Sequence, residues 1–362
     1  MQSTEYPLGV YENPASYFES VYQIFQNGEQ ADSASNNHFF NIDGQTIRLR
    51  FAGSSLTHRI IPALEHLRGV PTTSPQLTIC LWDSASTHNP FPLHPWSGNA
   101  SSAFGEGFHS DEGRIHFNDG RFRMYFYMDD MILMLDSHKD KAIFWVEDAQ
   151  KLPYHESGAP LRSLLDWWFS NSSRQFVHAA ALGTVKGGVL LIGKGGSGKS
   201  TTTLACLDSP LQIAGDDYCL LSSKPSPYVY SLYSTAKIDP LELNRLPHLK
   251  TDISNADRLE SEKALFFLYE RHPQKIIKGF PLRALLIPRI TGGMQTSIKP
   301  ASSMAGLMAL APSTIFQLVN EGSTSFDFMS RLVREIPSFH LDLGTDLAQI
   351  PATIMELLSN CQ

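Results

Sequence analysis

The residues best suited to chemistry lie in a glycine-rich run near the middle of the chain. Gly193-Lys194-Gly195-Gly196-Ser197-Gly198-Lys199-Ser200 fits the pattern GxxxxGK[ST], which binds nucleotide phosphates. Its glycines let backbone N–H groups turn toward a phosphate, and Lys199 supplies a mobile positive charge to the β- and γ-phosphates. Ser200 offers a hydroxyl to Mg²⁺, an ion that prefers hard oxygen ligands. The run, continued by Thr201, therefore predicts a site for ATP and Mg²⁺.

Two adjacent carboxylates follow this run. Asp216 and Asp217 come seventeen and eighteen residues after Lys199, at the end of the apolar stretch 211–215. Two neighbouring carboxylates at a strand end are costly unless positive charge lies nearby, and Mg²⁺ with Lys199 would supply it. One Asp would hold the metal, with Ser200 and Asp217 as the candidate ligands, and the other would accept a proton from an attacking hydroxyl. The sequence leaves open which Asp does which.

Two further cations are candidates for contact with the nucleotide. Phosphoryl transfer spreads negative charge over the equatorial oxygens, so a positive side chain besides Lys199 is expected. Lys237 and Arg289 each follow an apolar run that could deliver them to a shared strand edge. We therefore include both among the expected cofactor-binding residues.

Regular elements flank the glycine-rich run on both sides. Residues 176–185 and 188–192 are apolar and predict two strands joined at Lys186-Gly187. Residues 201–207 can continue as a helix whose positive N-terminal end faces the phosphates. A helix is expected over 160–169, because Pro160 suits a first turn, and another after Gly344, where Pro351 can introduce a kink.

The first half of the chain is expected to be rich in β-structure. Residues 45–51 alternate with period two, and residues 114–117 and 122–127 predict a hairpin that turns at Asp119-Gly120. A second strand pair, 131–135 and 142–146, brackets a polar turn. Beyond this point the strand-like patterns give way to helical spacing, so we predict a β-rich domain over residues 1–155 and a catalytic domain over 156–362. The fold class is mixed α/β.

Composition excludes several classes of function. The chain has 362 residues, a net charge of −7 and 42% hydrophobic residues, without the basic surplus that nucleic-acid binders use. We expect no nucleic-acid partner. The first residues lack a basic stretch followed by an apolar core, and no apolar run is long enough to span a membrane. A cytoplasmic protein is expected, with no membrane partner and four reduced cysteines.

Three stretches together resemble the catalytic core of the HPr serine kinase family. They are 177–183, which contains His178, then 188–200 and 214–217. In that family a His lies fifteen residues before the first glycine of the phosphate loop, and an Asp-Asp pair begins seventeen residues after its lysine. Both intervals hold here, from His178 to Gly193 and from Lys199 to Asp216.

This resemblance implies a phosphate-loop fold of the HPr kinase and phosphoenolpyruvate carboxykinase type. His178 would lie beside the Asp pair and orient it or share its proton, so the implied catalytic residues are His178, Lys199, Asp216 and Asp217. The implied activity is transfer of the γ-phosphate of ATP to a serine of a protein or peptide. The chain lacks the Arg-Gly-Leu-Gly stretch of HPr kinases. It looks more like diverged relatives, some of which phosphorylate a precursor peptide of a natural product.

Other functions share the glycine-rich run. Lys194 also completes the form KGGxGK[ST] of ParA- and MinD-like ATPase switches, although those proteins usually open with the motif. An inactive nucleotide-binding regulator, a phosphoenolpyruvate carboxykinase and a kinase for a small-molecule hydroxyl remain alternatives. The first domain carries no phosphate motif, so we expect it to recognise the acceptor or support the catalytic domain. A homo-oligomer remains open.

Overall fold

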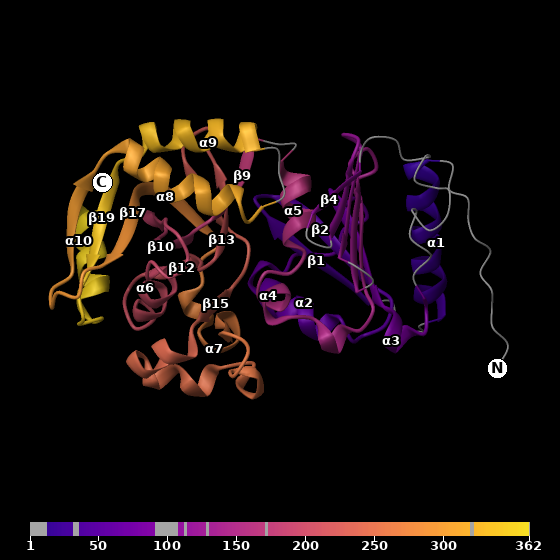
Figure 1. The fold of residues 1–362 in the computed structure, drawn as a ribbon, viewed down its shortest axis with the longest axis horizontal. Helices are drawn as coiled ribbons and strands as arrows, with labels where there is room; N and C mark the ends of the chain where they lie inside the picture. Colours follow the sequence, from indigo (N-terminus) through magenta and orange to yellow (C-terminus); the bar gives the residue numbers. More distant parts are fainter. Residues whose placement is uncertain are drawn as a thin grey trace. The chain divides into compact units, whose positions relative to one another are not determined.

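The computed structural model divides the chain into two compact units. It describes residues 13–31, 36–90, 108–111, 114–127, 130–170, 173–318 and 322–361 (Figure 1). The first unit holds most of the chain up to Leu152, and the second holds the chain from Pro153 onward together with the short segments 41–44 and 60–68. Helices and mixed sheets make the protein a mixed α/β structure. The first seven residues lie outside the described residues, so the expectation that rests on their lack of a basic stretch followed by an apolar core stays a prediction.

The first unit is an eight-stranded mixed sheet with one long helix packed on it. Its strands are β1 Asn36–Ile42, β2 Gln45–Phe51, β3 Leu77–Asp83, β4 Phe108–Asp111, β5 Arg114–Asn118, β6 Phe122–Tyr127, β7 Met131–Asp136 and β8 Lys141–Val146. Helices α1 Pro14–Ala31, α2 Thr57–Leu64 and α3 Ser84–Thr87 complete it, although α2 runs across the division between the units. Strands β5 and β6 pair antiparallel, as do β7 and β8, so both predicted hairpins are confirmed.

Helix α1 supplies an aromatic face to this sheet. Tyr17, Phe18 and Phe25 are buried in one cluster with Trp82 of β3 and Phe122 of β6. Burying side chains of this size contributes roughly 1.5–3 kcal/mol each, so the helix is held mainly by apolar burial. The sheet order is β1-β2-β3-β8-β7-β6-β5-β4.

The second unit surrounds a nine-stranded sheet with helices. Its strands are β9 Arg174–His178, β10 Ala180–Thr184, β11 Gly187–Leu191, β12 Gln212–Gly215, β13 Tyr218–Ser222, β14 Tyr228–Ser231, β17 Gly279–Ile290, β18 Ser297–Ala301 and β19 Ser338–Leu343, with β15 Thr235–Ile238 and β16 Ala264–Phe267 as a separate pair. Its helices are α4 Tyr154–Gly158, α5 Arg162–Phe169, α6 Lys199–Ala205, α7 Leu268–Arg271, α8 Ser303–Ile315, α9 Gly322–Glu335 and α10 Gln349–Asn360. Short 3₁₀ turns connect them, including Pro240–Arg245, Pro247–Asp252 and Ala256–Arg258.

Strand alternation divides the core of the second unit between the two faces of its sheet. Val189 and Leu191 of β11 pack with α6 and α10, whereas Leu190 and Ile192 pack with α8 and α9 (Figure 1). Side chains of successive strand residues point to opposite faces, which explains the continuous apolar run. The long strand β17 pairs with β14 at residues 279–281, with β11 between 282 and 286, and with β19 over 285–290.

One expected strand is in fact two. The sequence predicts a single strand over 176–185, but β9 ends at His178 and β10 begins at Ala180. Strand β9 pairs with β13, whereas β10 pairs with β11 and β12. The break at Ala179 lets one apolar run form both the edge strand β9 and the interior strand β10, which hydrophobic periodicity alone does not reveal. It also places His178 at a strand end.

The segment 60–68 is anchored in the second unit by buried polar contacts. His66 Nε2 lies 2.7 Å from the hydroxyl of Ser231, and Ser234 N–H donates to the carbonyl of Ala63 at 2.9 Å. Burial, with a smaller contribution from the charge of Lys278, lowers the pKa of His66 to about 3. The imidazole is therefore neutral in the folded protein at neutral pH.

The His66 pKa predicts a loss of stability on acidification. Unfolded His has a pKa near 6.5, so the unfolded chain takes up a proton that the folded chain refuses as pH falls from about 6.5 toward 3. Between pH 7 and pH 5 this linkage should remove on the order of 2 kcal/mol from the free energy of unfolding of the second unit. Denaturant titrations at both pH values should show a smaller acid loss in His66→Asn. Equal losses in the two proteins would contradict the assignment.

Within the described residues, no helix has the length and apolar character needed to cross a membrane.

Candidate active site

The glycine-rich loop joins β11 to α6 and contains backbone that favours glycine. Gly196 has φ of 76° and Gly198 has φ of 102°, both in the left-handed region. A Cβ on Gly198 would also lie 2.6 Å from Cδ1 of Leu343, so the end of that side chain would have to shift. Both glycines are therefore required by the local backbone.

Lys199 lies at the first position of α6, folded back against the loop. Its Nζ donates to the carbonyls of Gly193 at 2.7 Å and Lys194 at 3.3 Å, and the residue is buried. Burial lowers the pKa of Lys199 below its ordinary value, although the charges of Asp217 and Asp216 oppose the shift. The carbonyls of the loop thus hold the Lys199 ammonium on the concave side of the loop.

Asp216 follows β12 and lies beside the start of α6. Burial and the neighbouring charge of Asp217 raise the pKa of Asp216 to about 6, while the Lys237 N–H, 3.2 Å from Oδ2, and the hydroxyls of Ser200 and Thr203 oppose the shift. Within the described residues, no hydrogen bond of ordinary geometry reaches its buried Oδ1. Buried carboxylate oxygens normally have a partner. A carboxylate beside the Ser200 hydroxyl, with one oxygen that lacks a partner, is a set of oxygen ligands that fits Mg²⁺.

Asp217 has different surroundings from its neighbour. Its Oδ1 lies 3.0 Å from Nε2 of His178, and its Oδ2 lies 2.5 Å from Nζ of Lys237. Burial works against the charge on Asp217, but Lys237 and His178 outweigh it and hold the pKa of this carboxyl well below its usual range. Asp217 is therefore ionised, fixed by two groups and still a quarter exposed to the pocket.

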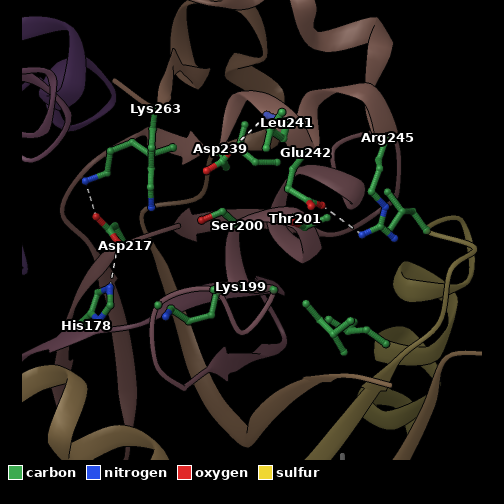
Figure 2. Close-up of a pocket in the computed structure, with 18 of the residues that line it drawn as sticks. His178, Lys199, Ser200, Thr201, Asp217, Asp239, Leu241, Glu242, Arg245 and Lys263 are labelled. Atoms are coloured by element: carbon green, nitrogen blue, oxygen red, sulfur yellow. Dashed lines mark hydrogen bonds and ion pairs between the residues drawn. The ribbon is translucent and has the colours of Figure 1, made fainter. Parts of the chain in front are cut away.

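Lys199, Asp217 and its partners line a pocket of about 780 Å³ within the second unit, whereas Asp216 is buried behind the lining. Figure 2 shows His178 and Asp217 at one end, Lys199 and Ser200 in the middle, and Glu242 and Arg245 at the other end. The lining also includes Tyr154, His155, Arg162, Tyr218 and Gln317, together with the apolar side chains Leu241, Ile290, Leu343, Leu347 and Ile350. The pocket thus has charged groups at both ends and apolar side chains in its wall.

The structure brings most of the predicted site residues together. The pocket is lined by Gly195, Gly196, Gly198, Lys199, Ser200, Thr201, Asp217, His178 and Lys237. Gly193 and Ser197 belong to the same loop, and the Oγ of Ser197 is buried without a hydrogen-bond partner among the described residues. Lys194 is exposed and does not line the pocket.

Arg289 departs from the sequence expectation. It lies opposite Asp342 in the parallel pairing of β17 with β19, and its Nη2 is 2.6 Å from Oδ1 of that Asp. Adjacent strand residues point to opposite faces, so Ile290 lines the pocket and Arg289 does not. Arg289 therefore pairs with Asp342 and does not contact the predicted nucleotide site.

Sequence reasoning also missed several residues that line the pocket. Asp239 is two residues after Lys237, so strand alternation could have placed both on one side. Tyr218 directly follows the Asp pair, and its hydroxyl receives a 2.9 Å hydrogen bond from Arg162. Lys263 comes from a distant segment, and no local pattern in the sequence marks it.

No protein-family model matches the chain, and no curated protein matches it either. The solved structures similar to this chain include one described as "Structure of the Hpr(Ser) kinase/phosphatase from Coxiella burnetii". The similar region covers 51% of this chain and 95% of that chain, with 13% sequence identity and a TM-score of 0.29. A similarity this remote supports no argument about activity.

Proposed function

We propose that the protein is an ATP-dependent kinase that transfers the γ-phosphate to a hydroxyl group. The observation that carries this proposal is the convergence, in one pocket, of a glycine-rich loop with Lys199 and an ionised Asp217 held by two cationic or polar partners. Such a loop cradles phosphates, and a fixed carboxylate beyond it can accept the proton of an acceptor hydroxyl. A simple nucleotide-binding module has no need of the second feature.

The metal position follows from the surroundings of the two aspartates. Asp216 lies beside Ser200 and has an orphaned oxygen, whereas both oxygens of Asp217 are taken by His178 and Lys237. We therefore assign Ser200 and Asp216 to Mg²⁺, in place of the pair Ser200 and Asp217 that the sequence suggested. The bound ion would neutralise charge on the β- and γ-phosphates.

Asp217 is the proposed proton acceptor. The acceptor oxygen forms a bond to the γ-phosphorus, the bond from that phosphorus to the bridging oxygen of ADP breaks, and the hydroxyl proton passes to the Asp217 carboxylate. A depressed pKa is compatible with this role, because the transition state is loose and the proton leaves late. Nε2 of His178 lies 3.0 Å from Oδ1 of Asp217, so we assign His178 a positioning role.

The acceptor enters from the Asp217 end of the pocket in this proposal. The phosphates would occupy the loop, and the apolar side chains Ile290 and Leu343 beside Gly198 suit the nucleotide base. The wall of Tyr154, Arg162 and Tyr218 is then left for the acceptor. We propose a serine of a protein or peptide, as the resemblance implies, with a small-molecule hydroxyl as the second candidate. Acceptor recognition by the first unit stays a prediction.

A labelled-phosphate assay tests the proposal. The protein is incubated with γ-labelled ATP and Mg²⁺, together with serine-containing peptides and proteins in one series and small hydroxylated metabolites in another. We expect label in an acid-stable phosphate ester in one series. Release of inorganic phosphate at a rate indifferent to every acceptor, with dependence on Lys194, would instead favour the ATPase switch.

The metal assignment predicts unequal effects of the two Asp-to-Asn changes. Asp216→Asn should raise the Mg²⁺ concentration needed for half-maximal transfer by roughly tenfold or more, because a metal ligand is lost. Asp217→Asn should leave that concentration nearly unchanged while lowering the maximal rate. Mg²⁺ titrations of both variants check this prediction. The assignment is wrong if the metal requirement shifts in Asp217→Asn and not in Asp216→Asn.

A further inference from the structure

The candidate pocket contains three lysines, and two of them already have partners. Lys199 is held by the loop carbonyls, and Lys237 is paired with Asp217. The third, Lys263, lines the pocket and forms no ion pair within the described residues. Figure 2 shows its side chain directed into the pocket from the wall opposite Lys199.

The backbone around Lys263 is fixed although its side chain is exposed. The amide of Asn255 donates from Nδ2 to the Lys263 carbonyl at 2.9 Å, and Oδ1 of Asn255 accepts from Leu265 N–H at 2.8 Å. Asn255 itself is buried, and β16, which begins at Ala264, pairs with β15. The exposed ammonium is therefore presented from a rigid anchor at one fixed place on the pocket wall.

The charges of Lys263 and Lys199 act on each other across the pocket. The charge of Lys263 contributes to the lowered pKa of Lys199, after the larger effect of burial. Like charges that face one another are unfavourable unless an anion lies between them. A β-phosphate cradled by the loop would lie near Lys199, and the next phosphate along would approach Lys263.

We propose that Lys263 is the residue that recognises the γ-phosphate, so that the pocket distinguishes a nucleoside triphosphate from a diphosphate. This inference rests on the proposed nucleotide site and adds a catalytic residue to it. Its ammonium would move onto the γ-phosphate as that group binds and would remain there as negative charge spreads over the equatorial oxygens. A diphosphate offers no group at this position, so it gains nothing from Lys263.

Binding measurements separate this role from a merely structural one. Calorimetry on the full chain should give the affinities of Mg·ATP and Mg·ADP for wild type, Lys263→Met, Lys263→Arg and the control Lys250→Met, whose lysine is exposed on the same unit outside the pocket. We expect Lys263→Met to weaken ATP by roughly tenfold and leave ADP within twofold, since one charge-assisted contact is lost. Lys263→Arg should keep most of the preference, and Lys250→Met all of it.

Transfer kinetics add a second readout. Lys263→Met should lower phosphoryl transfer by roughly 10²-fold, the usual loss for one group that stabilises transition-state charge. Equal weakening of ATP and ADP, or unchanged affinity for both, overturns the proposal. The binding result does not depend on finding an acceptor, so a failure of the kinase proposal leaves this test intact. Conversely, if Lys263→Met keeps the normal preference for ATP and still transfers phosphate, the role of Lys263 in recognising the γ-phosphate is refuted and the kinase proposal is not.

Discussion

Asp217→Asn should lower phosphoryl transfer by roughly 10²- to 10⁴-fold, the range expected for loss of a general base, while ATP remains bound. The change removes the charge that accepts the hydroxyl proton and keeps the volume of the side chain. The glycine-rich loop and Lys199 are untouched, so nucleotide affinity should stay close to wild type. Rates of transfer and calorimetric affinities, measured on the same preparations, check both halves of the prediction.

The same change should also reduce stability. Lys237 is mostly buried, with its side chain 12% exposed, and Asp217 is its ion-pair partner. Breaking a buried pair leaves an uncompensated charge, at a typical cost of roughly 3–5 kcal/mol. Adding Lys237→Met to Asp217→Asn should recover much of that stability without restoring transfer. Asp208→Asn, whose side chain is 89% exposed, is the matched control and should change neither property.

The second large effect is expected for Lys199→Met, which should weaken ATP binding and nearly abolish transfer. Lys199 is the buried cation held at the loop, and a Met of similar length removes its charge and its donors to Gly193 and Lys194. Loss of one such group typically costs roughly 10²- to 10³-fold in rate, and contact with both phosphates makes the larger value the expected one.

Lys194→Met provides the matched control for Lys199. The two lysines lie in one loop, but Lys194 is exposed and outside the pocket lining. We expect Lys194→Met to bind ATP and transfer phosphate as wild type does. A requirement for Lys194 together with indifference to Asp217 would contradict the kinase proposal and favour a switch in which Lys194 reaches the nucleotide of a partner copy.

The parts of the site that depend on local chain geometry were open to prediction from sequence. The spacing of Gly196, Gly198 and Lys199 defines a strand-to-helix turn whose positive-φ positions need glycine, and the structure has that turn. The β5–β6 hairpin of the first unit follows from two strand-like runs joined by an Asp-Gly turn. In each case the information lies within about ten neighbouring residues.

The parts that depend on distant partners could not be predicted. The sequence presents Asp216 and Asp217 as equivalent, and only the positions of Ser200 on one side and of His178 with Lys237 on the other distinguish them. The prediction that Arg289 binds the nucleotide was wrong because its ion-pair partner, Asp342, lies on a separate strand that is distant in the sequence. No sequence pattern marks Lys263, because its position depends on a hydrogen bond from the side chain of Asn255 to its carbonyl.

Segment 60–68 shows the same limit at the level of domains. The residue pattern changes near residue 155, and nothing in the composition indicated that residues 60–68 belong to the second unit. The contacts of Ala63 and His66 with residues 234 and 231 are what place it there. A polar contact between residues so far apart in the chain leaves no periodic trace in either stretch.

The most direct test of the central claim is the fate of the γ-phosphate in wild type and Asp217→Asn measured side by side. Labelled ATP, Mg²⁺ and an acceptor mixture are supplied to both proteins, and label is counted in acid-stable esters and in inorganic phosphate. We expect wild type to place label in esters and Asp217→Asn to lose this product by at least roughly 10²-fold while still binding ATP. Equal ester formation by the two proteins, or label appearing as inorganic phosphate alone with every acceptor, would contradict this expectation.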